Sequence, residues 1–573
     1  MNRLKLATRP RKRPVSWTKG KVPAPGGIWY LLDFFLFLKN FSSVLSIRIS
    51  SISLQMLLGL LLLGWSAEAQ VRFDSNFESG SLGSVQQIRN PRMRGGVRHV
   101  YYRIHGHYDP LNPIDTDLAA NANWYCFRIS GAAGIFFHIE MPSNVTYGAS
   151  YSYDGEQWSH LSGSESDRHN INKRFARDTV YIALYKPYTY SYLQERLQDW
   201  ASRPCVTLDT IGFSHEGRPL QMLHITDPDV PQEQKALMWM HGRTHPSESP
   251  GSYVLDGLVD YLTSDTEESA GLRRRIDAYI LPFSNPDGVA KGLSRSNALG
   301  VNQEINFGRS DDSTVVEVRA IKQMFSKLTA HRPLDIMLNS HSQLLETATF
   351  WMHRSDSTSA TYLRKQWTFT GLACSHNPSI QPHEMSFSYG GIRYAEGWMW
   401  KHFADSTLAI TIETPYNWYS FDRKLPVNDD NLRDFGKRTM QAVAEYLEIS
   451  VPGRYIIETP DNPGEDWAAF TADDRSFMGR NAFEAKRSNA VIQYVLESLP
   501  PGKYKLYRYE SGKCIQPDEG HTDLRTPRGW LKTGTHGWVY VKSINQELTG
   551  PFSFTWLAPA AGDLADALLL IKE

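Results

Sequence analysis

Two histidines and two glutamates stand where predicted strands end, and their side chains suit a hydrolytic metal site. His245 and Glu248 lie three residues apart in a loop that enters a predicted helix, so one turn can bring both to the same ion. His341 follows a second strand, and Glu413 ends a third. Zinc binds imidazole nitrogen and carboxylate oxygen, and three protein ligands leave its fourth position open for water. We therefore interpret His245, Glu248 and His341 as zinc ligands and Glu413 as a general base.

Taken singly, each of these residues also fits a simpler role. A lone histidine is more often buried and hydrogen-bonded in a core, and a glutamate at a strand end is often only an ion-pair partner. Their joint placement at three strand ends favours the metal site. Zinc there would lower the pKa of a water and polarise a scissile carbonyl.

The elements that must position these residues alternate along the chain. Apolar runs at residues 236–240, 278–283, 334–338 and 408–412 predict strands, and amphipathic runs at 253–262, 315–328 and 432–447 predict helices. Such alternation is typical of an α/β domain, and we expect a mixed, largely parallel sheet flanked by helices. Ligands of such sheets bind at the carboxyl ends of the strands, where the candidate residues lie.

Shorter β segments flank this region on both sides. We expect an N-terminal β-sandwich at residues 70–205, the catalytic α/β domain at 206–450 and a C-terminal β-sandwich at 451–573. The flanking segments are rich in aromatic and β-branched residues and are separated by turn signals. The C-terminal domain is a possible contact for glycan or peptide, although its aromatic residues are equally explained by its own core.

Residues 1–69 have the features of a targeting segment with an upstream extension. A short apolar run at residues 52–65 ends in Ala67-Glu68-Ala69, the small-x-small form of a signal-peptidase site. We expect cleavage between Ala69 and Gln70 and a secreted or periplasmic protein. A bilayer-spanning helix needs about 20 apolar residues. This run is shorter and interrupted, so we expect no stable membrane anchor.

The charge balance gives no reason to expect a nucleic-acid partner. Beyond residue 69 the chain carries 51 basic and 59 acidic residues, a net charge of −8. The four cysteines are far apart and lack the spacing of a zinc ribbon or redox pair. Isolated thiols are the favoured interpretation, and in an exported protein one disulfide between Cys126 and Cys205 is possible.

Several motifs resemble those of a known family. His245-Pro246-Ser247-Glu248, Asn285-Pro286-Asp287-Gly288-Val289, Ser340-His341-Ser342 and Thr411-Ile412-Glu413-Thr414 resemble, in order and context, the motif series of the zinc carboxypeptidases. Within that family they are most similar to the cytosolic carboxypeptidase subfamily, which also carries an N-terminal β domain.

The resemblance implies one zinc ion per chain and a role for each matching residue. It implies His245, Glu248 and His341 as ligands and Glu413 as the catalytic base. Arg295 falls where the family places an arginine that binds substrate and stabilises the oxyanion, a role that suits a permanently charged guanidinium. The family also uses a mobile tyrosine, for which Tyr389 and Tyr394 remain equal candidates.

One departure from the family pattern concerns substrate binding. After Arg295 the family has a Gly-x-Asp-x-Asn-Arg run whose last two residues bind the terminal carboxylate of the substrate. Here Glu304 replaces the asparagine and Ile305 replaces the arginine. Isoleucine cannot imitate a bidentate arginine, and Glu304 would repel a carboxylate. Either Arg309 or Arg393 takes over, or the substrate is not a free C-terminus. Glu304 could instead favour a cationic or amidated group.

The sequence therefore predicts an exported zinc metallocarboxypeptidase that acts on peptides or proteins at or near the C-terminus. Two alternatives stay open. One is a zinc amidase or peptidase for blocked or cell-wall-derived peptides, which Ile305 favours. The other is an inactive protein that retains zinc and only binds its ligand, against which the intact Glu413 argues.

Overall fold

The computed structural model describes residues 70–344, 346–380, 386–419, 425–470, 475–479, 481–514, 536–544 and 550–573. Every element described below belongs to the compact unit formed by residues 71–573. The predicted signal peptide and its cleavage after Ala69 lie outside the described residues. Within the described ranges no helix is both long enough and apolar enough to cross a membrane.

An eight-stranded mixed sheet forms the centre of the α/β domain. Its strand order is β10-β11-β13-β12-β14-β17-β15-β16. The strands are β10 (Val206–Phe213), β11 (Pro219–Ile225), β12 (Ala236–Gly242), β13 (Ile276–Leu281), β14 (Ile336–Gln343), β15 (Thr349–Met352), β16 (Ser386–Tyr389) and β17 (Leu408–Pro415). β13, β12, β14 and β17 pair in parallel, as do β15 and β16, whereas the other pairings are antiparallel. The expected mixed sheet and its four predicted strands are confirmed.

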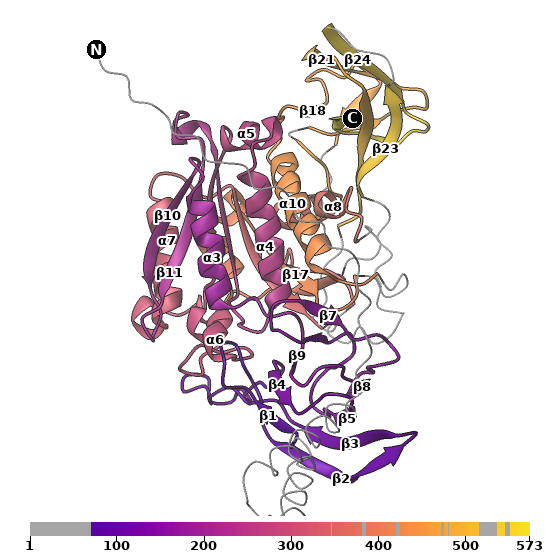
Figure 1. Ribbon diagram of the computed structural model, residues 1–573. Helices are drawn as coiled ribbons and strands as arrows, with labels where there is room; N and C mark the ends of the chain where they lie inside the picture. The colour runs from indigo at the N-terminus through magenta and orange to yellow at the C-terminus, as the bar shows by residue number, and fades with distance from the viewer. Residues whose placement is uncertain are drawn as a thin grey trace, which may run out of the picture. The chain divides into compact units, whose positions relative to one another are not determined.

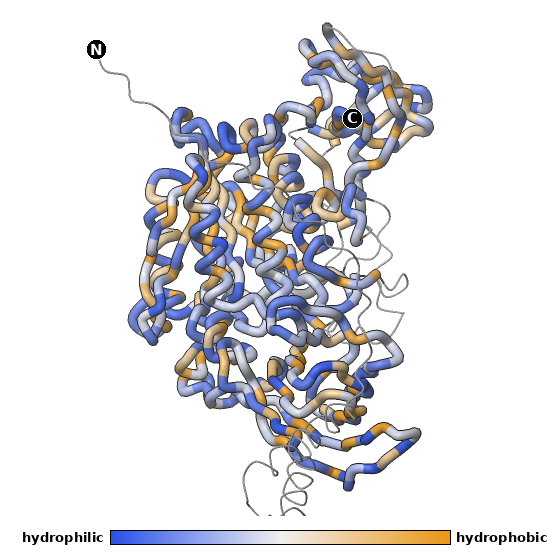
Figure 2. Tube along the Cα trace, in the orientation of Figure 1, coloured by the Kyte–Doolittle hydropathy of each residue, from blue (hydrophilic) through white to orange (hydrophobic). Residues whose placement is uncertain are grey.

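Helices cover both faces of this sheet. They are α3 (Tyr190–Ala201), α4 (Ser249–Leu262), α5 (Glu267–Arg273), α6 (Pro286–Lys291), α7 (Val316–Leu328), α8 (Ala360–Cys374), α9 (Ala395–Phe403) and α10 (Asp429–Tyr446). Figure 1 shows α3, α4 and α10 on one face. Alternate strand residues point to opposite faces. Accordingly, Met238 and Met240 of β12 pack with α4, α8 and α10, whereas Leu237 and Trp239 pack with α7 and α9. In Figure 2 hydrophobic residues gather along the strands behind α4.

Glycine allows α4 and α10 to lie very close together. A Cβ atom at Gly436 of α10 would lie 1.9 Å from the carbonyl oxygen of Val254 in α4. A Cβ atom at Gly257 of α4 would lie 2.0 Å from the carbonyl oxygen of Arg433. The first turn of α4 follows directly from Glu248, so this contact fixes the helix that carries the metal-binding loop.

Two sheets precede the α/β domain. One has the order β1-β4-β9-β6-β7 and the other β2-β3-β5-β8. Their strands are β1 (Arg72–Asp74), β2 (Val85–Arg94), β3 (Val97–Ile104), β4 (Cys126–Ser130), β5 (Phe136–Glu140), β6 (Ser150–Ser152), β7 (Trp158–His160), β8 (Asn170–Arg174) and β9 (Val180–Ala183). The ring of Phe73 in the first sheet lies 4.7 Å from that of Tyr102 in the second. The sandwich arrangement and its boundaries stay predictions.

The C-terminal region is also built from strands. β18 (Arg454–Ile457), β26 (Leu568–Lys572), β22 (Tyr504–Glu510) and β23 (Gly537–Ile544) form one sheet, in that order. β19 (Trp467–Ala469), β20 (Phe483–Ala485) and β25 (Leu564–Ala565) form a second, and β21 (Val491–Leu499) pairs with β24 (Gly550–Leu557). The predicted sandwich arrangement here also stays a prediction.

The cysteine pair considered above is not joined. Cys126 is buried and Cys205 is half-buried, and both are thiols. The favoured interpretation, isolated thiols, therefore holds for this pair.

Candidate active site

A short loop between β12 and α4 carries the first two candidate ligands. Arg243 adopts a left-handed backbone, with φ of 54°, and its buried guanidinium folds back onto this loop. Its Nε donates to the carbonyl oxygen of Pro246 at 3.1 Å, and its Nη1 donates to Ser252 Oγ in α4 at 3.0 Å. Arg243 therefore fixes the loop on the helix, and His245 and Glu248 face inward from it.

The three predicted ligands converge on one point. Glu248 Oε1 lies 2.9 Å from Nδ1 of His245, and Glu248 Oε2 lies 2.7 Å from Nδ1 of His341. The two Nδ1 atoms are 3.1 Å apart. All three side chains are buried. His341 reaches this point from β14, although it lies 93 positions after Glu248 and 96 after His245 in the sequence.

This arrangement of atoms fits a zinc ion. Ligand bonds of about 2.0–2.2 Å in a tetrahedral site place the donor atoms roughly 3.3 Å apart. The three separations here are slightly shorter, so a small outward shift would admit the ion. Two imidazole nitrogens and a carboxylate are also a donor set that zinc prefers. The donors agree with the residues that sequence reasoning predicted.

A second carboxylate, Glu304, lies on the other side of His341. Glu304 Oε2 is 3.1 Å from His341 Nε2, and donor atoms of His245, Glu304 and His341 lie within 4.8 Å of one another. Because Glu248 contacts both Nδ1 atoms and Glu304 contacts only the far nitrogen, we interpret Glu248 as the ligand. Glu304 then orients the imidazole of His341 from outside, as second carboxylates commonly do at metal sites.

The charges in this cluster are strongly coupled. Burial opposes ionisation of Glu304, but His341 outweighs it and lowers the pKa of Glu304 to about 2. Burial also opposes protonation of His341, yet Glu248 and Glu304 hold its pKa well above the ordinary value. A cation between these carboxylates is therefore favoured electrostatically.

His245 also has an outer partner that sequence reasoning missed. Its Nε2 lies 3.2 Å from Oδ1 of Asn302, which stands where the resembling family has aspartate. This contact leaves Nδ1 of His245 facing Glu248. The signal was present in the departure of Asn302 from the motif, but nothing in the sequence showed that it touches a ligand.

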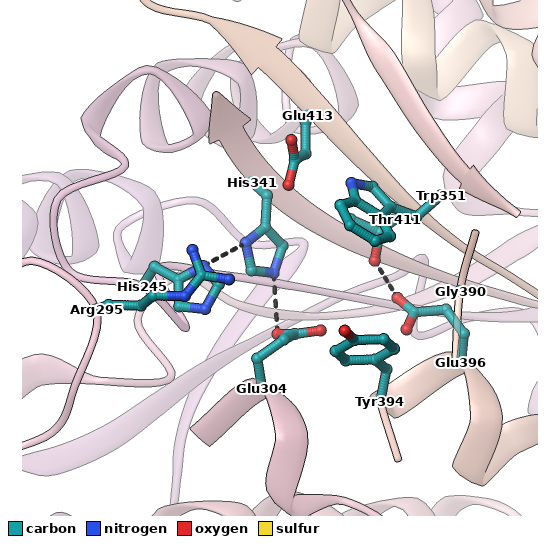
Figure 3. A pocket seen from close by; sticks show the side chains of 10 residues that line it. All are labelled: His245, Arg295, Glu304, His341, Trp351, Gly390, Tyr394, Glu396, Thr411 and Glu413. Atoms are coloured by element: carbon teal, nitrogen blue, oxygen red, sulfur yellow. Dashed lines mark hydrogen bonds and ion pairs between the residues drawn. The ribbon is translucent and has the colours of Figure 1, made fainter. Parts of the chain in front are cut away.

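A small pocket of about 30 Å³ opens beside the ligands and holds the other catalytic candidates. Figure 3 shows its ten lining residues: His245, Arg295, Glu304, His341, Trp351, Gly390, Tyr394, Glu396, Thr411 and Glu413. Glu413 of β17 is the register partner of His341 in β14, so the sheet itself places the predicted base beside the ligands. Burial and the Glu248 carboxylate raise the pKa of Glu413 to about 7.

The loop that carries Arg295 is held by a residue outside the α/β domain. The Asp109 carboxylate accepts hydrogen bonds from the backbone N–H groups of Ser294, Arg295 and Ser296, at 2.7, 2.7 and 2.9 Å. Asp109 is buried. Sequence reasoning missed this residue, because it lies 185 positions before the loop and belongs to no motif.

The same loop is tied to the ligand loop from the other side. Ser247 donates from its backbone N–H at 3.2 Å and from its hydroxyl at 2.7 Å to the carbonyl oxygen of Ser294. Asn285 donates to the carbonyl oxygens of Thr244 and Ser296, at 3.3 and 3.0 Å. The Asn-Pro-Asp-Gly motif therefore joins the two loops.

Two polar residues, Asn339 and Thr411, contact the glutamates on the acidic side of the pocket. Asn339 Nδ2 lies 3.2 Å from Glu304 Oε1 and 3.3 Å from Glu396 Oε1. Thr411 donates its hydroxyl to Glu396. Burial and the neighbouring Glu304 raise the pKa of Glu396 to about 7. Glu396 comes from α9 and was not predicted, because only the folded chain brings α9 to this pocket.

Of the remaining predicted substrate-binding residues, some line the pocket and others do not. Tyr394 lines the pocket, whereas only the backbone of Tyr389 is described, at the end of β16. Ile305 is half-buried and is not among the lining residues. The two arginines considered as replacements are engaged elsewhere. Arg309 donates to Asp115 Oδ1 at 2.6 Å, and Arg393 lies 5.6 Å above the Tyr394 ring. Among the described lining residues Arg295 is the one permanent cation.

Residues 190–448 match the family model described as zinc carboxypeptidase. The match begins at α3, earlier than the proposed domain boundary at 206. The chain is 26% identical over 322 residues to cytosolic carboxypeptidase 2 of Danio rerio, covering 49% of this chain and 42% of that protein. It is 25% identical to cytosolic carboxypeptidase 6 of Caenorhabditis elegans, covering 47% and 62% of the two chains. The chain thus spans less than two thirds of both relatives.

Solved structures share the fold. A metallo-carboxypeptidase from Burkholderia cenocepacia superposes with a TM-score of 0.54 at 20% identity, covering 65% of this chain and 98% of the other. A metallo-carboxypeptidase from Pseudomonas aeruginosa, in complex with (2-guanidinoethylmercapto)succinic acid, gives a TM-score of 0.54 at 18% identity, covering 66% and 99%. At these identities the likeness shows the fold alone.

Proposed function

We propose that this chain, whose residues 190–448 match the zinc carboxypeptidase family model, is an exported metallocarboxypeptidase that hydrolyses the last peptide bond of its substrates. The convergence of His245, Glu248 and His341 beside Glu413 and Arg295 carries this proposal. A binding protein without activity would not need a carboxylate and a guanidinium facing the same small pocket.

Each pocket residue has its own role in the proposed reaction. Zinc bound at the three ligands supplies a Lewis acid that activates water and polarises the carbonyl. Glu413 accepts a proton from the attacking water and passes it to the leaving amine. Arg295 stabilises the negative charge that develops on the carbonyl oxygen. Tyr394 lines the same pocket.

The acidic side of the pocket supports a cationic leaving residue. Glu304 and Glu396 are both buried, and Asn339 bridges them. Arg295 sits on the opposite side, next to His245, and does not neutralise this pair by any direct ion pair among the described contacts. The charged end group of a lysine or arginine side chain would supply a positive charge on this acidic side. We therefore propose substrates that end in a basic residue.

A second candidate function is favoured because Ile305 stands where the resembling family has a carboxylate-binding arginine. Ile305 is absent from the pocket lining, and Arg309 and Arg393 are engaged with Asp115 and Tyr394. No second guanidinium among the described lining residues awaits a free carboxylate. The same catalytic groups would then act on amidated or otherwise blocked peptides.

Export is proposed from the sequence. The apolar run at residues 52–65 and the Ala67-Glu68-Ala69 site support it. The relatives are named cytosolic, so the proposed location separates this chain from them. Expression with a C-terminal tag, fractionation and N-terminal sequencing should give a mature chain that begins at Gln70 outside the cytoplasm. A chain retained whole in the cytoplasm would refute export.

Mass spectrometry of paired peptides tests the activity and the choice of substrate. Each peptide ends in Lys, Leu or Glu and is offered as a free acid and as an amide to the zinc-loaded protein and to a Glu413→Gln variant. Rapid loss of Lys from free acids, absent in the variant, is expected. Cleavage confined to amides would establish the second candidate. No cleavage of any peptide would refute hydrolysis and leave a zinc-retaining binding protein.

A further inference from the structure

We propose that the segment formed by residues 109–121 of the N-terminal region builds a second substrate subsite, which holds the peptide residue on the acyl side of the scissile bond. This inference rests on the proposed function. It concerns a cavity outside the matched family region, since half of its wall comes from a part of the chain before residue 190.

The cavity lies beside the catalytic pocket and measures about 160 Å³. From the N-terminal region it is lined by Asp109, Pro110, Asn112, Leu118, Ala119, Ala120 and Asn121, and from the α/β domain by Arg295, Ser296, Gly300 and Asn302. This volume is comparable with a cavity of about 150 Å³ that accepts a benzene-sized group. It is therefore large enough for one side chain.

Arg295 joins this cavity to the catalytic pocket, because it lines both. The catalytic pocket is much smaller, and Glu304, Glu396 and Thr411 are among its lining residues. In the proposed reaction this pocket takes the leaving residue. The larger cavity adjoins the pocket at Arg295, so it can take the residue before the scissile bond.

The cavity wall is firmly built. The segment closes on itself through the Asp109 backbone N–H, which donates to the carbonyl oxygen of Asn121 at 2.8 Å. The Asp109 side chain then holds the backbone of the Arg295 loop through three hydrogen bonds. Both walls are thus fixed relative to Arg295 before substrate arrives, as an ordered subsite requires.

Two buried polar atoms in the lining lack a partner. Asn112 is 8% exposed, and its Nδ2 has no hydrogen-bond partner among the described residues, although its Oδ1 accepts from Ile114 and Asp115. Ser296 is 4% exposed, and its hydroxyl likewise has none. Buried polar atoms are normally paired, so these two are available to hydrogen-bond a group that enters the cavity.

The chemistry of the wall identifies the occupant. Asn112 Nδ2 and the Arg295 guanidinium donate hydrogen bonds and suit a peptide carbonyl oxygen. Pro110, Leu118 and the two alanines present an apolar surface. The Asp109 carboxylate already accepts hydrogen bonds from three N–H groups, so it does not favour a cationic occupant. We expect a neutral residue with a small apolar side chain.

Filling the cavity tests the proposal. Ala120→Trp places a large ring in it, and Thr116→Trp, exposed and outside the lining, is the matched control. Two substrates are compared, acetyl-Ala-Lys free acid, which offers a methyl side chain to the cavity, and acetyl-Gly-Lys free acid, which offers none. Wild type should cleave the alanine peptide with a kcat/KM roughly 10-fold higher, the size of a lost side-chain contact.

Ala120→Trp should remove that advantage and leave the glycine peptide within about twofold of wild type, while Thr116→Trp behaves as wild type. Equal kcat/KM for the two peptides in wild type, or an undiminished advantage in Ala120→Trp, would overturn the subsite. The same comparison by calorimetry on zinc-loaded Glu413→Gln measures binding without turnover. Tighter binding of the alanine peptide without any cleavage by wild type would refute the proposed function and support the subsite, whereas equal binding of both peptides would refute the subsite.

Discussion

At the scale of single residues, Glu304 is the proposed selector of the substrate's last residue. It stands where the resembling family has an asparagine that binds the substrate carboxylate, and here it contacts a candidate zinc ligand and bridges through Asn339 to Glu396. One substitution thus changes both the outer support of His341 and the charge of the pocket. Specificity and metal support are coupled at this position.

Glu304→Gln should lower kcat/KM for Lys-ended peptides relative to Leu-ended peptides by about 10-fold or more, the effect of losing one charge-assisted hydrogen bond. The ratio of the two kcat/KM values is the measurement. Asp312→Asn, which changes an exposed acid in the following segment, is the control and should leave the ratio unchanged. An unchanged ratio in Glu304→Gln would exclude Glu304 as the selector.

The site residues that could be predicted from the sequence are those with a recognisable spacing. His245 and Glu248 share one turn, and His341 and Glu413 follow apolar strands, so their positions at one sheet edge could be predicted. Asp109, Asn339 and Glu396 could not be predicted in this way. Their proximity depends on the pairing of β14, the packing of α9 and the docking of the N-terminal region, none of which has a local signal.

At the scale of elements, the loop of Arg295 is held between two others. Asp109 binds three of its backbone N–H groups, and Ser247 binds its carbonyl oxygen from the ligand loop. The guanidinium is therefore positioned relative to the zinc ligands by backbone contacts and not by its own side-chain partners. Asp109 is a positioning residue in this arrangement.

Asp109→Asn should lower kcat roughly 10- to 100-fold, because a shift of about 1 Å in a positioning group has effects of that size. Bound zinc should change little, since no ligand is touched. Kinetics and metal analysis on the same preparation measure both, with Asp117→Asn, an exposed acid of the same segment, as the control. A wild-type kcat would contradict the positioning role.

The helices and strands of the α/β domain follow from periodicity. The predicted strand at 236–240 lies within β12, and the predicted helix at 432–447 coincides closely with α10. Residues Met238 and Trp239 point to opposite faces, and both faces are covered, which explains why this strand reads as continuously apolar. Sheet order could not be derived, because it depends on which distant strands pair.

At the scale of the whole described unit, a buried ion cluster joins α10 to the C-terminal strands. Glu445 of α10 accepts from Arg438 at 2.8 Å and also pairs with Arg454 of β18. Its Oε2 accepts from Trp538 Nε1 in β23 at 2.9 Å. Both Glu445 and Arg438 are buried. The C-terminal sheet is therefore attached through charges that depend on one carboxylate.

Glu445→Gln should destabilise the protein by about 3–5 kcal/mol, because it leaves the buried guanidinium of Arg438 without its counter-charge and leaves Arg454 with only Glu268, 3.7 Å away. Denaturant unfolding at pH 7 measures the loss. Glu497→Gln, an exposed acid on β21, is the control and should change stability by less than about 0.5 kcal/mol. A loss as small as that of the control would show that the cluster contributes little.

The same carboxylate should make stability depend on acid pH. Burial opposes its ionisation, but Arg438 and Arg454 outweigh burial and lower the pKa of Glu445 from 4.5 to about 2. A lowered folded-state pKa stabilises above the unfolded value, so this contribution should fade as the pH falls from about 4.5 to 2. The difference in free energy of unfolding between wild type and Glu445→Gln should be smaller at pH 3 than at pH 7. A gap of constant size would contradict the assignment.

The central claim is that one zinc ion is held by His245, Glu248 and His341. Zinc content and turnover of one Lys-ended peptide, measured together in Glu248→Ala and Glu304→Gln after dialysis against a weak chelator, test it most directly. The account predicts that Glu248→Ala loses zinc and activity. Glu304→Gln should keep one zinc per chain, with an affinity weaker by about 10- to 100-fold. Retention of zinc by Glu248→Ala together with its loss from Glu304→Gln would contradict the account and make Glu304 the ligand.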